Sequence, residues 1–259
     1  AGSTVVHSIG GWCALAGVLV LGPRLGRFDK NGKPRDLPGH NLSYVALGGF
    51  ILWFGWFGFN GGSTLSASID IARVNLNTQL AAAAGAVGST LYRMLSRRPV
   101  LLTKTVNGSL AGLVAVTAGC AVMSPGFAVL TGLVAGALAA LGARLMLSMR
   151  LDDVVGAVPV HAFAGAWGTL AAGLFYEGDL FNPERITVQL LGIVVAFCWA
   201  FFAALIMYLA VSVIAGLRAP ALHEQRGLDL SEHAETGYPE FPQNSLYDAS
   251  MTRTVENRP

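Results

Sequence analysis

Two histidines lie in stretches of the sequence that are otherwise apolar. His7 and His161 are the only acidic or basic side chains well inside the long charge-free runs of the chain. A neutral imidazole offers one donor and one acceptor nitrogen, and a protonated one offers two donors. Its charge change lies nearest physiological pH among the side chains. Two such rings together could relay a proton or hydrogen-bond a small neutral polar molecule.

The two histidines also share a local pattern. Residues 6–11 read VHSIGG and residues 160–165 read VHAFAG, so both contain V-H-x-x-x-G. A weak repeat between segments of opposite direction is typical of inverted-topology transporters, whose site lies between the repeats. We expect His161 about eight residues into its helix and His7 at a similar depth from the other face. The two rings would then meet near the middle of the membrane.

Other interpretations of the histidine pair remain open. Each ring could be a structural residue that hydrogen-bonds a neighbouring helix. A metal site is a poor fit, because two histidines without a third ligand do not match the usual coordination sets. Cys13, Cys120 and Cys198 lie far apart in apolar stretches, where we expect buried thiols. The sequence therefore predicts neither a cofactor nor a metal.

An aromatic stretch, WFGFNGGS at residues 56–63, is the third feature of interest. Its aromatic residues could form an ordinary interfacial belt. Alternatively they could attract a cation through their ring faces, while the Ser63 hydroxyl accepts a hydrogen bond from it.

The elements that carry these residues follow from the distribution of charge. Only 12% of the 259 residues are charged, and residues 1–218 hold 22 of the 32. This excludes a soluble enzyme, a nucleic-acid binder and a disulfide-stapled secreted module. A helix needs about 20 apolar residues to cross a bilayer. The charge-free runs are 1–23, 37–69, 74–92, 105–143, 154–176 and 186–217. Because the run 105–143 is broken at residues 124–126, we predict an all-α integral membrane protein with seven transmembrane helices.

The basic residues predict how the chain is oriented in the membrane. Alternate loops and the C-terminal part hold 15 of the 17 Lys and Arg residues. Basic residues concentrate on the cytoplasmic side, so the chain should begin outside and end in the cytoplasm. We expect a transmembrane region at 1–218 and a cytoplasmic tail at 219–259, loose beyond about Phe241. The chain begins with Ala1 and lacks a basic leader, so we expect a part of a longer multi-pass protein of the cell membrane.

Several motifs resemble the ammonium transporter (Amt) family, which is related to the Rh proteins. Residues 55–63, GWFGFNGGS, resemble the family's hallmark, and TVVH at 4–7 resembles its fifth transmembrane helix. Residues 152–161, followed by GTL at 168–170, resemble the tenth helix, and 227–233 resemble the start of the cytoplasmic C-terminal region. The resemblance covers residues 1–241 in family order. It implies crossings five to eleven of an eleven-helix inverted-repeat fold.

The resemblance also implies a function and roles for individual residues. Ammonium would be recruited at an outer vestibule and lose its proton, and ammonia would pass an apolar pore lined by the twin histidines, His7 and His161. Phe59 matches a gate phenylalanine and Ser63 the outer-site hydroxyl, whereas Leu52 and Ala157 match apolar pore-lining residues. The implied assembly is a homotrimer in the lipid bilayer, with a P-II-type signal protein at the cytoplasmic face. Ammonium and ammonia are the implied substrates.

Some family features are missing, and other functions compete. The family's outer tryptophan, second gate phenylalanine and vestibule aspartate belong to its earlier half. Gly156 stands where some members carry an acidic residue, and Ala234 replaces a glycine common in the tail motif. A sensor on the same scaffold and a non-conducting remnant are the competing hypotheses. An enzyme is not expected, because no nucleophile or metal set accompanies the histidines.

Overall fold

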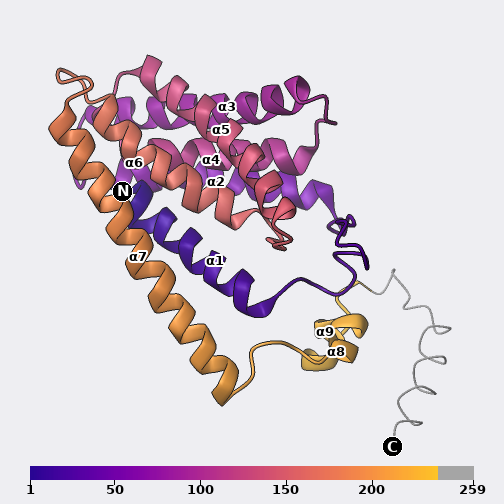
Figure 1. Ribbon diagram of the computed structural model, residues 1–259. Helices are drawn as coiled ribbons and strands as arrows, with labels where there is room; N and C mark the ends of the chain where they lie inside the picture. The colour runs from indigo at the N-terminus through magenta and orange to yellow at the C-terminus, as the bar shows by residue number, and fades with distance from the viewer. Residues whose placement is uncertain (239–259) are drawn as a thin grey trace, which may run out of the picture. The chain divides into compact units, whose positions relative to one another are not determined.

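The computed structural model describes residues 1–238, which fold almost entirely into helices (Figure 1). The helices of the first part are η1 (Ser3–Ser8), α1 (Ile9–Leu21), α2 (Leu42–Gly62), α3 (Asp70–Leu95), α4 (Leu102–Val116), α5 (Pro125–Ser148), η2 (Val158–Phe163), α6 (Ala164–Leu174) and α7 (Pro183–Ile214). Two short helices follow, α8 (Ala221–Arg226) and α9 (Leu228–His233). Within the described residues only an isolated bridge, Phe28–Pro34, has β pairing. The prediction of an all-α fold is confirmed.

Four continuous helical segments are long and apolar enough to cross a membrane. They are Ser3–Leu21, Leu42–Gly62, Pro125–Ser148 and Pro183–Ile214. The other three predicted crossings correspond to α3, to α4 and to η2 with α6. Because α3 carries several polar side chains and α4 has only 15 helical residues, the count of seven transmembrane helices stays a prediction.

Glycine and alanine determine how closely the helices pack. Small residues spaced by four, such as Gly108/Gly112 and Gly132/Gly136, suit close packing of helices in lipid. A side chain at Gly112 or Gly132 would overlap the Ala81 carbonyl oxygen of α3, and one at Gly136 would overlap that of Gly85. The backbones of α4 and α5 therefore rest directly on α3. Alanines 81, 82, 111, 115, 135 and 139 fill the small space that remains and are buried.

The remaining helices surround this group of three. In Figure 1, α7 lies along the outside of α1 and α6. Helices α2 and α7 leave large apolar side chains exposed, including Phe50 and Phe54 on α2 and Trp199 and Ile206 on α7. Exposed apolar area of this extent suits a helix surrounded by lipid or by further protein. Of the three cysteines expected to be buried, Cys120 is buried, Cys13 is partly buried and Cys198 is exposed on α7.

The structure corrects three local expectations. The glycine- and serine-rich composition of residues 61–64 predicts a loop, but Gly61 and Gly62 belong to α2, and a side chain at Gly61 would crowd Asn75. Helix α4 ends at Val116, well before the predicted break at 124–126. His161 is the fourth residue of η2 rather than about the eighth of its helix, because residues 154–156 are not helical.

The chain divides into two units, with the boundary between Gly216 and Leu217. In the second unit, the structure describes α8 and α9 and the residues up to 238. Its contacts include an ion pair of 2.9 Å between Arg218 and Glu224 and a hydrogen bond from the Gly237 N–H to Asp229. The predicted loose segment beyond Phe241 lies outside the described residues.

Candidate functional site

The structure brings the two predicted histidines together. His7 lies in η1 and His161 in η2, and their ring centroids are 5.5 Å apart with the planes inclined by 26°. Contacts pair Thr4 with Thr169 and Ser8 with Ala162, so the two segments run in opposite directions. The Nε2 atom of His7 is buried and has no hydrogen-bond partner among residues 1–238. A buried ring nitrogen without a partner can bind a small polar ligand.

Each histidine occupies a wide π-helical turn. The N–H of Ile9 donates to the Thr4 carbonyl and that of Ala164 to the Pro159 carbonyl, five residues back in both cases. Single π turns inside helices occur frequently at functional sites. Within the described part of the chain, these are the only two π turns. No signal in the sequence predicted them.

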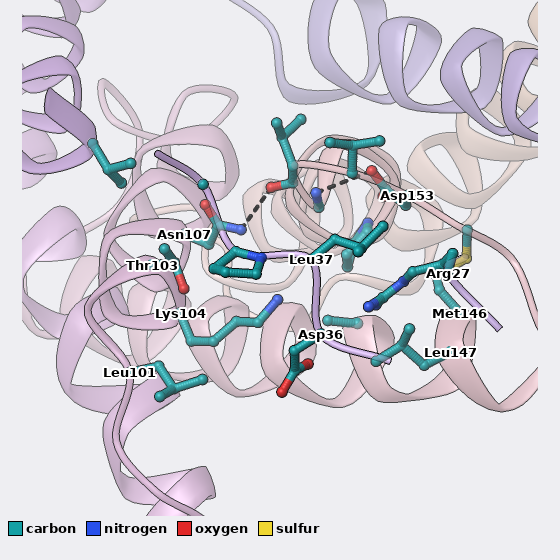
Figure 2. A pocket seen from close by; sticks show the side chains of 18 of the residues that line it. Arg27, Asp36, Leu37, Leu101, Thr103, Lys104, Asn107, Met146, Leu147 and Asp153 are labelled. Atoms are coloured by element: carbon teal, nitrogen blue, oxygen red, sulfur yellow. Dashed lines mark hydrogen bonds between the residues drawn. The ribbon is translucent and has the colours of Figure 1, made fainter. Parts of the chain in front are cut away.

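A cavity of about 600 Å³ lies beside the start of η2. Gly156 and Pro159 line it, and Pro159 is two residues before His161. Figure 2 shows the side chains of Arg27 and Lys104 pointing toward one another across it. Asn107 closes one wall by donating to the Val155 carbonyl at 2.8 Å. The lining of the cavity therefore includes the start of the segment that carries His161.

Two carboxylates hold the approach to η2 in place. The N–H groups of Gly156, Ala157 and Val158 donate to Asp153 at 2.8–3.0 Å, as expected for an acid at a helix start. Asp152 is buried and binds the guanidinium of Arg24 through both oxygens. Burial works against its charged form, but the hydrogen bonds and charge of Arg24 hold the pKa of Asp152 below its ordinary value.

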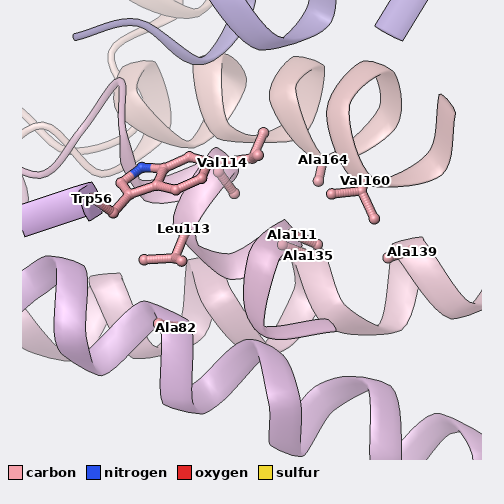
Figure 3. Close-up of a cluster of buried hydrophobic side chains, with 10 residues drawn as sticks. Trp56, Ala82, Ala111, Leu113, Val114, Ala135, Ala139, Val160 and Ala164 are labelled. Atoms are coloured by element: carbon pink, nitrogen blue, oxygen red, sulfur yellow. The ribbon is translucent and has the colours of Figure 1, made fainter. Parts of the chain in front are cut away.

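Trp56 completes the surroundings of the histidine pair. Its ring stacks on His7 with centroids 5.0 Å apart, and Phe59 meets His7 edge-on at 5.7 Å. The indole N–H donates to the Thr117 hydroxyl at 2.9 Å. In Figure 3, Trp56 lies at one end of the main core cluster, beside Val114. Trp56 was not among the site residues predicted from the sequence, although its spacing of three from Phe59 places both on one helix face.

The other predicted site residues lie on the same segments. Leu52 precedes Trp56 by one turn of α2 and is half exposed. Ser63 follows the last residue of α2 and donates its hydroxyl proton to the Phe59 carbonyl at 2.6 Å, which leaves its oxygen free to accept. Ala157 directly precedes η2, one turn before His161. The ring contacts thus join Phe59 and His161 to His7. Leu52, Ser63 and Ala157 make no ring contact; each lies four residues along the chain from a residue whose ring contacts His7.

Comparison with known proteins identifies the family. A family model described as "Ammonium Transporter Family" matches residues 1–238. The chain belongs to the ammonium transporter family. It is 45% identical to the ammonium transporter Amt2 of Archaeoglobus fulgidus over 93% of this chain and 55% of that protein. It is 33% identical to ammonium transporter 1 member 1 of Arabidopsis thaliana over its whole length and 58% of that protein.

Solved structures of the ammonium transporter family have the same fold. A structure titled "Sensor Amt Protein" matches with a TM-score of 0.85 and 37% identity over 89% of this chain and 59% of that chain. Mep2 of Saccharomyces cerevisiae matches with a TM-score of 0.77 and 28% identity over 85% of this chain and 53% of that chain. The protein is therefore an all-α integral membrane protein. The chain spans about half the length of the curated relatives it matches.

Proposed function

We propose that this chain forms part of a conduit for ammonium and ammonia across the membrane, with His7 and His161 in its wall. The observation that carries the proposal is the histidine pair, whose ring centroids are 5.5 Å apart and whose His7 Nε2 is buried without a partner. The names of the relatives support transport of ammonium, and a transport role requires no nucleophile or cofactor.

The chemistry of the pair suits ammonia better than a metal cation. Ammonia can both donate and accept hydrogen bonds, as can a neutral imidazole. An ion such as K⁺ would lose its hydration in an apolar constriction without compensation. Ammonium can avoid this cost because it can leave its proton behind. A pathway lined by rings and apolar side chains therefore selects for a species that can become neutral.

Phe59 and Ser63 would recruit the ammonium cation. The Ser63 oxygen can accept a hydrogen bond from ammonium; its hydroxyl binds the backbone carbonyl of Phe59, whose ring contacts His7. Leu52 and Ala157 would line the conduit as apolar surfaces. Trp56 joins this set because its ring covers one face of His7.

The proposal also covers the orientation of the chain in the membrane and its assembly. Residues 1–218 would form the membrane region of a multi-pass protein of the cell membrane, with the first residues outside. Residues 219–259 would form a cytoplasmic tail. The family resemblance supports a homotrimer and a P-II-type signal protein that binds at the cytoplasmic face.

The histidine pair provides the test. In the protein expressed from its complete gene, His161→Asp should abolish methylammonium uptake, because a carboxylate in the apolar conduit retains a cation instead of passing a neutral molecule. The matched control is His40→Asp, which changes an exposed histidine in the loop before α2. Unchanged uptake in His161→Asp would contradict the proposed conduit.

A sensor is the second candidate function, because one structure that resembles this chain is titled "Sensor Amt Protein". In a sensor, ammonium binding would alter the tail without net flux. Measurement of uptake into liposomes, together with ammonium-dependent protease protection of residues 219–259, separates the two. Protection without uptake favours the sensor, and uptake favours the conduit.

A further inference from the structure

The two histidine segments touch through backbone atoms, in a nearly symmetric way. Gly11, four residues after His7, lies against Ala162, the residue that follows His161; a side chain there would come within 2.7 Å of the Ala162 Cα. Gly165, four residues after His161, lies against Ser8, the residue that follows His7; its side chain would come within 3.0 Å of the Ser8 nitrogen. The shared glycine of V-H-x-x-x-G thus allows each helix to approach the other's histidine turn.

One polar interaction breaks this symmetry. The position after the histidine is Ser8 in one segment and Ala162 in the other. The Ser8 side chain is fully buried, and its hydroxyl donates to the Ala162 carbonyl at 3.0 Å. Ser8 and Gly11 therefore hold the residue after His161 from two sides. A side chain at Gly165 would approach the Ser8 oxygen within 2.7 Å, so the hydroxyl has little freedom to turn elsewhere.

The contact matters because glycine and alanine surfaces resist sliding only weakly. A slip of one helix by one residue would shift its histidine by about 1.5 Å relative to the other. A directional hydrogen bond, unlike van der Waals contact, selects one register. The bond from Ser8 is made beside both rings, whereas the contact of 2.6 Å between the Thr4 and Thr169 hydroxyls lies farther from them along the helices.

We propose that Ser8 is a positioning residue, which fixes the register of His7 against His161 through its hydrogen bond to the Ala162 carbonyl. The proposal rests on the conduit proposed above. Ser8 does not contact Phe59 or Ser63 through a hydrogen bond in the described structure, so its effect belongs to passage along the conduit and not to recruitment.

Ser3 provides a matched control on the same π turn. It is also fully buried, and its hydroxyl donates to the carbonyls of Val114 and Ala115 on α4 instead of to the second histidine segment. Loss of the Ser8 hydroxyl removes one hydrogen bond to a carbonyl, whereas loss of the Ser3 hydroxyl affects two carbonyls and also removes the acceptor of the Ala118 N–H. Only the loss of the Ser8 hydroxyl should disturb the imidazole pair.

The experiment compares Ser8→Ala and Ser3→Ala in the protein expressed from its complete gene. We expect Ser8→Ala to lower the maximal rate of methylammonium uptake about tenfold while the half-saturation concentration stays within about twofold. The ring ¹⁵N resonances of His7 and His161 should shift in Ser8→Ala and stay in place in Ser3→Ala. Both variants should unfold at a lower temperature than the unmodified protein.

Two results would overturn the role of Ser8. One is an unchanged maximal rate with unchanged ring resonances in Ser8→Ala, and the other is the same loss in Ser3→Ala. If Ser8→Ala does not fold, Ser8→Cys replaces it; its weaker thiol donor should give a smaller loss of rate, and an intact rate would contradict the proposal. Should His161→Asp retain uptake, the conduit fails, yet the ring resonances still decide whether Ser8 positions the histidines.

Discussion

The imidazole of His7 is enclosed by three other rings. Trp56 covers one face, His161 lies at a stacked distance, and Phe59 meets it edge-on. Since the sequence repeats V-H-x-x-x-G, it could predict that the two histidines meet. It could not predict the role of Trp56, because an aromatic residue near the end of a membrane helix is equally typical of an interfacial belt. The decisive fact is that the indole faces inward, where a hydroxyl on another helix binds its N–H.

Thr117 should therefore affect both stability and transport. In Thr117→Val the buried indole N–H of Trp56 loses its acceptor, which costs about 1–3 kcal/mol. We expect a lower Tm in detergent and slower methylammonium uptake, since the ring covering His7 is released. Thr187→Val is the matched control, because the Thr187 hydroxyl donates to the Pro183 carbonyl on the exposed side of α7. A Tm equal to that of the control would contradict the role assigned to Thr117.

At the scale of the helices, the apolar runs predicted where most helices lie but not where each helix ends. Helices α2, α3, α5 and α7 lie within or around the predicted charge-free runs, and α5 begins at Pro125 next to the predicted break. The early end of α4 was not predictable from local sequence. Asn77 of α3 donates to the carbonyls of Cys120 and Met123, and Ser3 binds those of Val114 and Ala115. Non-helical backbone at membrane depth is tolerated only where such partners satisfy it, and these come from distant segments.

Where α5 packs against α3, replacing a contact glycine by any larger residue should destabilise the protein. In Gly136→Ala the new methyl group would overlap the Gly85 carbonyl oxygen, so the helices must separate along their length. We expect a loss of about 3 kcal/mol or more, seen as poor folding yield and a lower Tm. In Gly126→Ala, also on α5, the methyl group meets no atom within 4 Å, so stability should be unchanged or slightly increased. Equal stability of the two variants would show that the helices do not pack in this way.

At the scale of the whole molecule, two further contacts join the histidine segments besides the one between the Thr4 and Thr169 hydroxyls. Near the middle, Ser8 and Gly11 hold the turn of His161. Beyond the end of α1, the Arg24 guanidinium holds Asp152, which lies just before η2. Because the segments run in opposite directions, the end of one meets the start of the other. The partners of Asp152 on the loop after α1, Arg24 and Arg27, became evident only from the structure.

The ion pair between Arg24 and Asp152 should be lost at low pH. The pKa of Asp152 lies below its ordinary value, so the carboxylate stabilises the folded protein above the pKa of the unfolded chain and loses this contribution as the pH falls through the folded value. We expect a constant Tm from about pH 8 to pH 5 and a decline below about pH 4. Asp152→Asn should lower the Tm at pH 7 by leaving Arg24 and the mostly buried Arg27 without their carboxylate partner, a cost of about 3 kcal/mol, and should flatten the acid decline. Asp179→Asn is the control: its pair with Arg185 is about 40% exposed on both sides, so its removal should leave the Tm almost unchanged. An acid decline as steep in Asp152→Asn as in the unmodified protein would assign the effect to other carboxylates.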